Sequence, residues 1–486
     1  MILPSVKHNF LFNLINTSLK IIFPLILLPY VSRILLPEGV GRINYAEAVI
    51  NYFILFSSLG IPLYGIREIA KYRDNQLVLF QKMAGIFSVN FCLVILSYSA
   101  LLLCLWFSVI EKEFTLVLIN SSLILFSLIE AEWFFQGMEN YRYITIRNVL
   151  VKSASLILIC SLVKTKEDIM LYAVILVLGI GGNALFNFSY IIKNHGSTLL
   201  PYLKLRLIKQ AFKEHINAII ITSSMALAAS IYLNLDVIML GYFSTNAEVG
   251  YYTSCIKIMR VLITVVLALL TVLLPRSSFL VSNNQMQEFE KLIILSFKFI
   301  CFIGLPCITG ILLLSKQMIF VFFGESFYPA YGVMNLLCVL LFFVSMNNLL
   351  GMQILYPLNR ERKFLYSILG GAIVNFSANL FLIYNFQAIG AAIGSVLAEI
   401  VIFIFLFISA KDYFKLIFLK KGINYLIASA VMAIVISLLN STLTINVYVD
   451  LLIKIAVASI TYFLSLIVLK ETEFIKAALK LVANKK

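Results

Sequence analysis

The sequence predicts an all-α membrane protein that crosses a bilayer many times, and three observations support this. Hydrophobic residues make up 62% of the 486 residues and charged residues 13%, with a mean hydropathy of +0.99. Soluble proteins carry roughly 25% charged residues. Hydrophobic runs follow one another with no long polar stretch between them, and the first run, Phe10 to Val31, holds a central lysine, Lys20. One membrane domain without an appended soluble domain is expected.

The hydrophobic runs give about fourteen transmembrane helices at about twenty residues per crossing. The predicted ranges are 9–32, 43–65, 79–107, 114–136, 143–163, 168–192, 216–241, 249–274, 292–315, 330–354, 363–384, 387–409, 422–439 and 449–469. The first range lacks a small-residue cleavage site, so a spanning helix is expected there and not a signal peptide. An even number of crossings places both ends of the chain on one side.

The distribution of basic residues predicts which side that is. The net charge is +15, but Lys and Arg are scattered among short loops, without the aromatic-interleaved patch of a nucleic-acid-binding protein. Loops on the side of the N-terminus hold about four times as many basic residues as the opposite loops, and basic loops stay in the cytoplasm. The opposite loops hold Arg33, Arg42, Lys112, Lys164, Lys166 and Lys316. Both termini are therefore expected in the cytoplasm.

An internal repeat predicts the domain organisation. Residues near 9–65 and near 216–274 each read as a long outward helix, a short loop and a returning helix, with the loops at Glu38–Gly41 and Glu248–Gly250. An offset of six helices gives both copies the same orientation, which leaves a binding cavity between two lobes. The predicted divisions are an N-lobe at 1–193, a cytoplasmic linker at 194–215, a C-lobe at 216–410, and a final helix pair with a cytoplasmic tail at 411–486.

Lys20 is the first candidate for binding an anionic substrate. A charge at the centre of a spanning helix costs roughly 2.5–3.5 kcal/mol, so it faces protein or a water-filled pathway. Pro24 and Pro29 remove backbone hydrogen bonds from the same helix and would bend its outer half. A cavity position is favoured over a purely structural pairing with a carboxylate.

Lys152 is the second candidate cation. It lies between one-third and one-half of the way across the predicted helix 143–163, which also carries Arg147. Glu130 and Glu132 end the preceding helix on the same side and could pair with these bases as a structural clamp. Both a cavity position and a clamp remain open for Lys152.

Polar residues on the second helix suggest a cavity wall. Asn44, Glu47 and Asn51 are spaced i, i+3 and i+7, so they share one helix face. Polar groups within a membrane must face protein or water. Hydrogen bonding between helices and a cavity wall are equally consistent with this stripe.

Asp236, Lys257 and Arg260 form a second charged set. Asp236 lies near the outer end of the predicted helix 216–241, and the two bases lie at a similar depth on the next helix. An ion pair or a proton-coupled switch would fit, and the excess base could bind a ligand. Arg260 is the deeper base and the preferred ligand candidate, with Lys257 beside it.

Glu399 is a candidate for ion coupling. It lies mid-span in the predicted helix 387–409, after the close-packing spacing Gly390-x-x-x-Gly394. It could take up a proton or a sodium ion, or bond to a neighbouring helix. Lys298 and Lys454 are expected to extend to the membrane interface.

Catalytic motifs are missing from the sequence. It contains no GxxxxGK[ST] phosphate loop, no HExxH and no metal-ligand cluster, and its histidines are His8, His195 and His215. No metal, cofactor or ATP hydrolysis is expected. No predicted outer loop exceeds about fifteen residues, which argues against a polysaccharide polymerase with an external catalytic loop.

Several segments together resemble a known family. They are Leu28–Arg33, Gly39–Tyr45, Leu63–Lys71, Trp133–Gly137, Asp236–Gly241, Glu248–Tyr252 and Leu274–Arg276. In order, over about residues 9–410, they resemble the Wzx-type flippases of bacterial O-antigen and capsule synthesis, within the multidrug/oligosaccharidyl-lipid/polysaccharide exporter superfamily. The resemblance implies two six-helix lobes forming a V around a cationic cavity. The extra final helix pair resembles the pair that forms a lipid-tail groove in peptidoglycan-precursor flippases.

The substrate implied by the resemblance is an undecaprenyl-pyrophosphate-linked oligosaccharide, turned from the cytoplasmic to the outer leaflet of the bacterial cytoplasmic membrane. Lys20, Arg260 and Lys152 would hold the pyrophosphate. A gradient of H+ or Na+, or consumption of the product outside, would drive transport. A polymerase and a chain-length regulator would be partners, with no nucleic acid involved. A drug or cation exporter of the same superfamily is the alternative, although an acidic cavity would suit it better, and a polysaccharide polymerase is less favoured.

Overall fold

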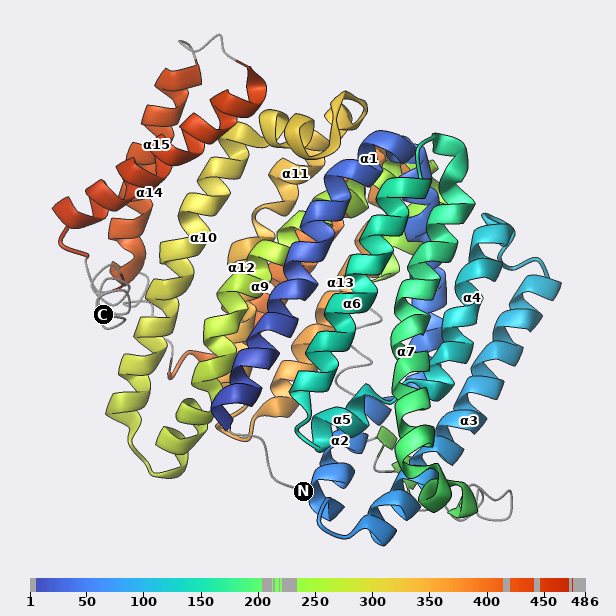
Figure 1. The fold of residues 1–486 in the computed structure, drawn as a ribbon. Helices are drawn as coiled ribbons and strands as arrows, with labels where there is room; N and C mark the ends of the chain where they lie inside the picture. Colours follow the sequence, from blue (N-terminus) through green and yellow to red (C-terminus); the bar gives the residue numbers. More distant parts are fainter. Residues whose placement is uncertain are drawn as a thin grey trace. The chain divides into compact units, whose positions relative to one another are not determined.

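The computed structural model describes residues 6–202, 212, 215–217, 219–220, 234–413, 420–440, 446–471 and 474, and all regular structure within them is helical (Figure 1). The helices of the first half are α1 (Val6–Ser58), α2 (Ile61–Tyr72), α3 (Gln76–Trp106), α4 (Phe114–Ile129), α5 (Glu132–Gly137), α6 (Tyr141–Leu162), η1 (Lys166–Asp168), α7 (Ile169–Leu199) and η2 (Leu200–Tyr202). Those of the second half are α9 (Asn246–Ser282), α10 (Met286–Phe323), η3 (Glu325–Ala330), α11 (Tyr331–Leu337), α12 (Leu340–Asn348), η4 (Leu349–Leu355), α13 (Glu361–Ala410), α14 (Ile423–Asn440) and α15 (Val447–Val468).

Eleven helical stretches in the described residues are long and apolar enough to cross a membrane, which confirms the predicted all-α, multi-pass class. Two of them contain a sharp backbone break, α1 at Leu36 and α13 at Gln387. Counting the halves separately gives thirteen spanning segments. Most of the predicted helix 216–241 lies outside the described residues. Its last part is described and belongs to a short apolar helix, Asn234–Phe243. The count of fourteen therefore stays a prediction.

The predicted loop at Glu38–Gly41 is wrong, because these residues are helical. The chain turns at one residue, Leu36, with φ 59° and ψ 173°. Pro37 follows it, and a proline disfavours the α conformation in the residue before it. Proline is also suited to the first position of a helix, where its missing N–H would have no partner. The chain does change direction in this region, as predicted, but the turn takes one residue and not a loop.

The chain packs as two compact units, residues Met1–Gly250 and Tyr251–Lys486. In the first unit α1 packs against α3, α4 and α6, and α7 packs against α4 and α6 (Figure 1). The predicted lobe boundary near 194–215 stays a prediction, because most of residues 203–233 lie outside the described part of the chain.

Two glycines allow α2 and α5 of the first unit to pack closely together. The Trp133 ring on α5 lies so close to Gly65 on α2 that a Cβ there would come within 2.5 Å of it. Gly137 approaches Ile69 in the same way, with a Cβ contact of 2.7 Å. These glycines let two short helices approach side by side. The segment Trp133–Gly137, which the resemblance singled out, is thus a packing element.

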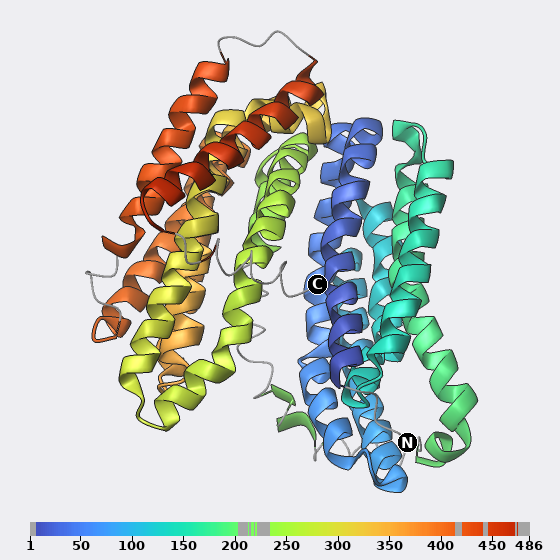
Figure 2. The same cartoon turned by 60° about the vertical axis from the view of Figure 1, so that its left-hand side comes forward.

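In the second unit α10 is the central helix, contacting α11, α12, α14 and α15. The final pair, α14 and α15, lies side by side against it (red in Figure 2). The two halves of α13 also pack together. A Cβ on Gly390 would lie 2.0 Å from the Leu382 carbonyl oxygen, and one on Gly394 2.2 Å from Asn379 Oδ1. The prediction that this glycine spacing serves close packing is confirmed.

The prediction that Lys454 extends to the interface is wrong, whereas the same prediction for Lys298 stays a prediction. Lys454 is 2% exposed, and its Nζ lies 2.6 Å from Asp450 Oδ2, one turn away on α15. Lys298 Nζ lies 3.3 Å from Glu471 Oε2, with 12% of its side chain exposed. Each lysine has an acid within reach, and for the buried Lys454 the ion pair replaces the contact with water.

Candidate functional site

Lys152 and Lys20 lie at the same level of the first unit. Lys152 is half-buried on α6, and its Nζ donates a hydrogen bond of 3.4 Å to the carbonyl oxygen of Leu19 on α1. It also lies 5.5 Å from the centre of the Phe23 ring. Lys20 is the residue after Leu19; the structure describes its helical backbone and not its side chain. Two candidate cations on different helices are thus brought to one short stretch of α1.

At this level the backbone of α1 also has a carbonyl group without its usual helical donor. Pro24 lies inside the helix, four residues after Lys20. Since proline has no N–H, it cannot donate the usual helical hydrogen bond to the Lys20 carbonyl oxygen. The stretch 19–24 therefore combines an accepting carbonyl group with the position of a cation.

A buried polar chain lies next to the Lys152 level and joins four helices. Arg147, 4% exposed, places Nη2 2.5 Å from Glu132 Oε2 on α5 and 2.9 Å from Asn148 Oδ1. Its Nη1 donates to Asn187 Oδ1 on α7. Asn148 Nδ2 in turn donates to Asn16 Oδ1 on α1, at 2.8 Å. The expected clamp between the start of helix 143–163 and the preceding acids thus exists, formed by Arg147 and Glu132.

The three residues of the predicted polar stripe, Asn44, Glu47 and Asn51, lie in different surroundings. Asn44 is buried and donates to the Val40 carbonyl oxygen of its own helix at 2.7 Å. Glu47 is half-buried and interacts electrostatically with Tyr172 on α7. Asn51 is exposed. Asn44 and Glu47 therefore face their own unit at these contacts, and the role of the stripe as a cavity wall stays a prediction.

The charged set around Asp236 falls in both units. Asp236 is 5% exposed and interacts electrostatically with Tyr52 of α1, within the first unit. Lys257 is half-buried and Arg260 exposed, both on the part of α9 that belongs to the second unit. The ion pair expected between Asp236 and these bases stays a prediction.

Glu399 is bound to a neighbouring helix. Asn347 Nδ2 on α12 donates to Glu399 Oε2 at 2.6 Å and to the Glu399 carbonyl oxygen at 3.0 Å. Glu399 is 9% exposed. Of the two readings, the structure supplies the hydrogen bond between helices; ion uptake stays a prediction, since an amide donor can bind either a carboxylate or its protonated form.

The two copies of the predicted repeat motif meet within the first unit. A Cβ on Gly41 would lie 1.7 Å from the Asn246 carbonyl oxygen, and one on Gly250 would lie 2.1 Å from the Pro37 carbonyl oxygen. Each glycine thus meets the residue four positions before the other glycine. We call this set, Pro37, Gly41, Asn246 and Gly250, the repeat contact. Its exchanged pairing is what two copies of one motif give when they pack about a local two-fold axis.

Charged residues that the sequence analysis did not select as site residues surround the repeat contact. Glu113 Oε2 accepts from Arg42 Nε at 2.8 Å, and Glu113 Oε1 from Asn246 Nδ2 at 3.0 Å. Lys112 Nζ donates to the carbonyl oxygens of Gly241, at 2.6 Å, and Ser244, at 3.1 Å. Burial lowers the pKa of Lys112, and the neighbouring Glu113 carboxylate partly offsets this. The one available signal was that Lys112 and Arg42 are among the few basic residues on the predicted outer side.

The described residues hold neither a metal-binding cluster nor a disulfide. They contain no group of three or more His, Cys, Asp or Glu side chains that could hold a metal ion. All seven cysteines lie in the described part, and each is a free thiol. The polar groups brought together here can bind anions and hydroxyl groups and can hold helices in one arrangement.

Comparison with known structures defines the class of protein. A solved structure titled "Lipid II flippase MurJ, inward closed conformation" matches 97% of this chain and 100% of its own, with TM-score 0.70 and 17% sequence identity. An inward-facing multidrug resistance MATE family transporter of the MOP superfamily matches 80% of this chain and 94% of its own, with TM-score 0.62 and 14% identity. The fold is that of these membrane transporters.

Sequence comparison places the chain more narrowly. A relative from Escherichia coli strain K12 named "Putative O-antigen transporter" is 25% identical over 401 residues, 80% of this chain and 92% of the relative. Residues 6–281, more than half of the chain, match the polysaccharide biosynthesis protein family. The chain belongs to that family, and it is a multi-pass membrane protein.

Proposed function

We propose that this protein is a flippase that moves undecaprenyl-pyrophosphate-linked oligosaccharide repeat units of O-antigen or capsule across the bacterial cytoplasmic membrane. Its family, its transporter relative and its flippase-like fold support the substrate class. The observation that carries the proposal is the contact of Lys152 Nζ with the Leu19 carbonyl oxygen, next to Lys20. Two lysines on one level of two helices suit a doubly charged pyrophosphate.

The physical need for such a protein follows from the substrate. A sugar hydroxyl transferred unpaired from water to hydrocarbon costs several kcal/mol, of the order of 4–8 kcal/mol in the least polar reference. An oligosaccharide carries many hydroxyls, so spontaneous crossing is too slow to be useful. A polar pathway lined by Lys20, Lys152 and Arg260 removes that cost for the headgroup, while the lipid chain stays in the bilayer.

Transport would proceed by alternating access of two six-helix lobes about a central site, with both termini in the cytoplasm. With that topology the repeat contact lies at the outer ends of the helices. A Cβ on its two glycines would lie 1.7 Å and 2.1 Å from a carbonyl oxygen of the other segment, so there is no room for side chains and the two segments can seal against each other. The Arg42–Glu113–Asn246 bonds would hold the seal until substrate binding releases it.

An ion gradient is proposed as the source of energy, with Asp236 and Glu399 as coupling groups. Both are buried acids, with exposures of 5% and 9%. Acidic residues inside spanning helices mark ion pathways and proton relays in membrane proteins. The final helix pair would guide the lipid chain: an apolar pocket of about 410 Å³ lies between α9, α10, α14 and α15, lined in part by Phe302, Pro306 and Tyr462.

The proposal is tested by complementation in the source organism with its chromosomal copy deleted. The wild-type gene should restore surface polysaccharide, whereas Lys20→Ala and Lys152→Ala should leave repeat units on the cytoplasmic leaflet at normal protein levels. Lys20→Arg keeps the charge, and Lys291→Ala removes an exposed lysine paired with Glu288; both should complement. Full display from the Lys20→Ala, Lys152→Ala double variant contradicts the proposal.

A drug exporter of the same fold predicts another phenotype. Its deletion would sensitise cells to cationic drugs and leave surface polysaccharide unchanged. The flippase proposal predicts loss of polysaccharide without drug sensitisation. Growth on a drug panel and polysaccharide staining of the same deletion strain distinguish the two.

A further inference from the structure

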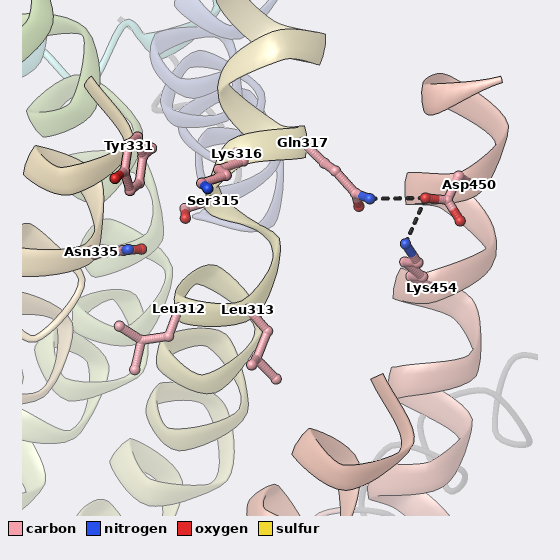
Figure 3. Close-up of a pocket in the computed structure, with 9 residues that line it drawn as sticks. All are labelled: Leu312, Leu313, Ser315, Lys316, Gln317, Tyr331, Asn335, Asp450 and Lys454. Carbon is pink, nitrogen blue, oxygen red and sulfur yellow. Dashed lines mark hydrogen bonds and ion pairs between the residues drawn. The ribbon is translucent and has the colours of Figure 1, made fainter. Parts of the chain in front are cut away.

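A polar cavity lies in the second unit, among α10, α11 and α15, and none of the candidate transport residues lines it. Its volume is about 440 Å³, within the range of about 300–1,000 Å³ typical of small-molecule sites. Figure 3 shows Gln317 on α10 reaching toward Asp450 on α15, and Lys316 and Ser315 lying near Tyr331 and Asn335 of α11. The apolar sides of the cavity are Leu312 and Leu313.

One wall of the cavity is a fixed hydrogen-bonded group. Asp450 Oδ2 accepts from Lys454 Nζ at 2.6 Å and from Gln317 Nε2 at 2.9 Å. Asp450 is 5% exposed and Lys454 2% exposed. Because Gln317 donates through its amide nitrogen, the orientation of its amide is set, and Gln317 Oε1 is left as an acceptor.

Three buried oxygens around the cavity lack donors. Gln317 Oε1, Asn335 Oδ1 and Asp450 Oδ1 accept no hydrogen bond from any residue that the structure describes. Buried polar atoms in native proteins are nearly always paired, and an unpaired one is costly. Three acceptors at one cavity call for a ligand with several donors, which means either a cation or a molecule with several hydroxyl groups.

The charge around the cavity excludes the cation. Lys316 and Lys454 contribute two positive charges against the one negative charge of Asp450. Asp450 is already paired with Lys454, whereas Lys316 pairs with no acid in the described part of the chain. Its Nζ lies 4.9 Å from the centre of the Tyr331 ring, which a sugar face could also contact. An acid group on the ligand would pair with Lys316.

We propose that this cavity binds a polyhydroxylated anion, namely an acidic sugar, whose hydroxyls donate to Gln317, Asn335 and Asp450 and whose acid group binds Lys316. Lys316 is among the basic residues predicted on the outer side, so the natural source would be a sugar residue of a glycan exposed there. The headgroup of an anionic glycerolipid shares this chemistry. Binding at this cavity does not depend on the proposed transport activity and is measured without it.

The test uses the full-length protein in phosphatidylcholine nanodiscs, with D-glucuronate and D-glucose as probes in saturation-transfer NMR. Glucuronate should bind the wild type about tenfold more tightly than glucose, as expected for one charge-assisted hydrogen bond. Lys316→Gln should abolish that difference, and Asn335→Leu should weaken both sugars. Lys291→Gln, an exposed lysine on the same helix, should change neither.

Two results would overturn the proposal. One is no glucuronate signal from folded wild-type protein, which would mean that Gln317, Asp450 and Lys454 only hold α15 to α10. The other is equal glucuronate affinity in wild type and Lys316→Gln. Phosphatidylglycerol nanodiscs identify the source: competition with glucuronate there assigns the site to a lipid headgroup, and unchanged binding assigns it to a sugar. Both outcomes keep the same ligand chemistry.

Discussion

Gly41 and Gly250 occupy equivalent places in a contact between two copies of one motif. A Cβ on either would lie within 1.7 Å or 2.1 Å of a carbonyl oxygen of the other segment. The relationship explains why both motifs carry glycine, although glycine is unfavourable within a helix by about 1 kcal/mol relative to alanine. Close approach of two backbones is the compensating gain, and it requires the missing side chain at both places.

Alanine at either glycine should destabilise the repeat contact. Overpacking of this kind typically costs about 1–3 kcal/mol, so Gly41→Ala and Gly250→Ala should each lower the thermal midpoint of the purified protein. Gly310→Ala is the matched control, because a Cβ there meets nothing within 4 Å. The double variant should cost less than the sum of the single ones, because both act on one contact. Equal midpoints for Gly41→Ala and Gly310→Ala would show that the contact is not populated.

Loss of Arg147 should be severe. Removing one partner of a buried ion pair costs about 3–5 kcal/mol, and Arg147→Ala leaves Glu132 without its partner at 2.5 Å. We expect a large fall in the denaturant midpoint and in the yield of folded protein, with partial recovery in Arg147→Ala, Glu132→Gln. Lys291→Ala breaks the exposed pair with Glu288 and should leave the denaturant midpoint nearly unchanged. If the two single variants lose equal stability, the buried pair is not structural.

Glu399→Gln separates packing from ion coupling. A glutamine keeps a carbonyl oxygen that can accept from Asn347 Nδ2, now at 2.6 Å from the carboxylate, but it cannot ionise. The variant should fold normally and lose the dependence of transport on an imposed ion gradient. Glu399→Ala should lose stability as well, since Asn347 then lacks its side-chain acceptor. Gradient-dependent transport that survives in Glu399→Gln would remove Glu399 from the coupling mechanism.

The helices were predictable because each must supply about twenty apolar residues in a row. Predicted range 79–107 became α3 (Gln76–Trp106), and 449–469 became α15 (Val447–Val468). The turn at Leu36 was not predictable in detail. Glycines and a proline indicate a change of direction, but only the packing partner shows whether that change takes one residue or ten.

The site was less predictable for a related reason. Hydropathy shows that a charge is costly in a membrane, and this drew attention to Lys20 and Lys152. Hydropathy cannot show which acid lies within reach of a buried base. Lys454 was expected at the interface because a lone lysine is costly to bury. It is buried because Asp450, one turn away on the same helix, pairs with it. The acceptors of the polar cavity, such as Asn335, carry no signal in the sequence because single polar residues are common in spanning helices.

The central claim is that Lys20 and Lys152 form a site for a lipid-linked pyrophosphate that crosses the membrane. The most direct measurement is the rate at which reconstituted protein moves an undecaprenyl-pyrophosphate-linked oligosaccharide between leaflets of a proteoliposome, followed by accessibility of the sugar to an external lectin. We predict gradient-stimulated movement by wild-type protein and by Lys291→Ala, and a rate at the protein-free level for Lys20→Ala, Lys152→Ala at equal reconstitution. Wild-type rates from that double variant, or no movement by the wild type, would contradict the account.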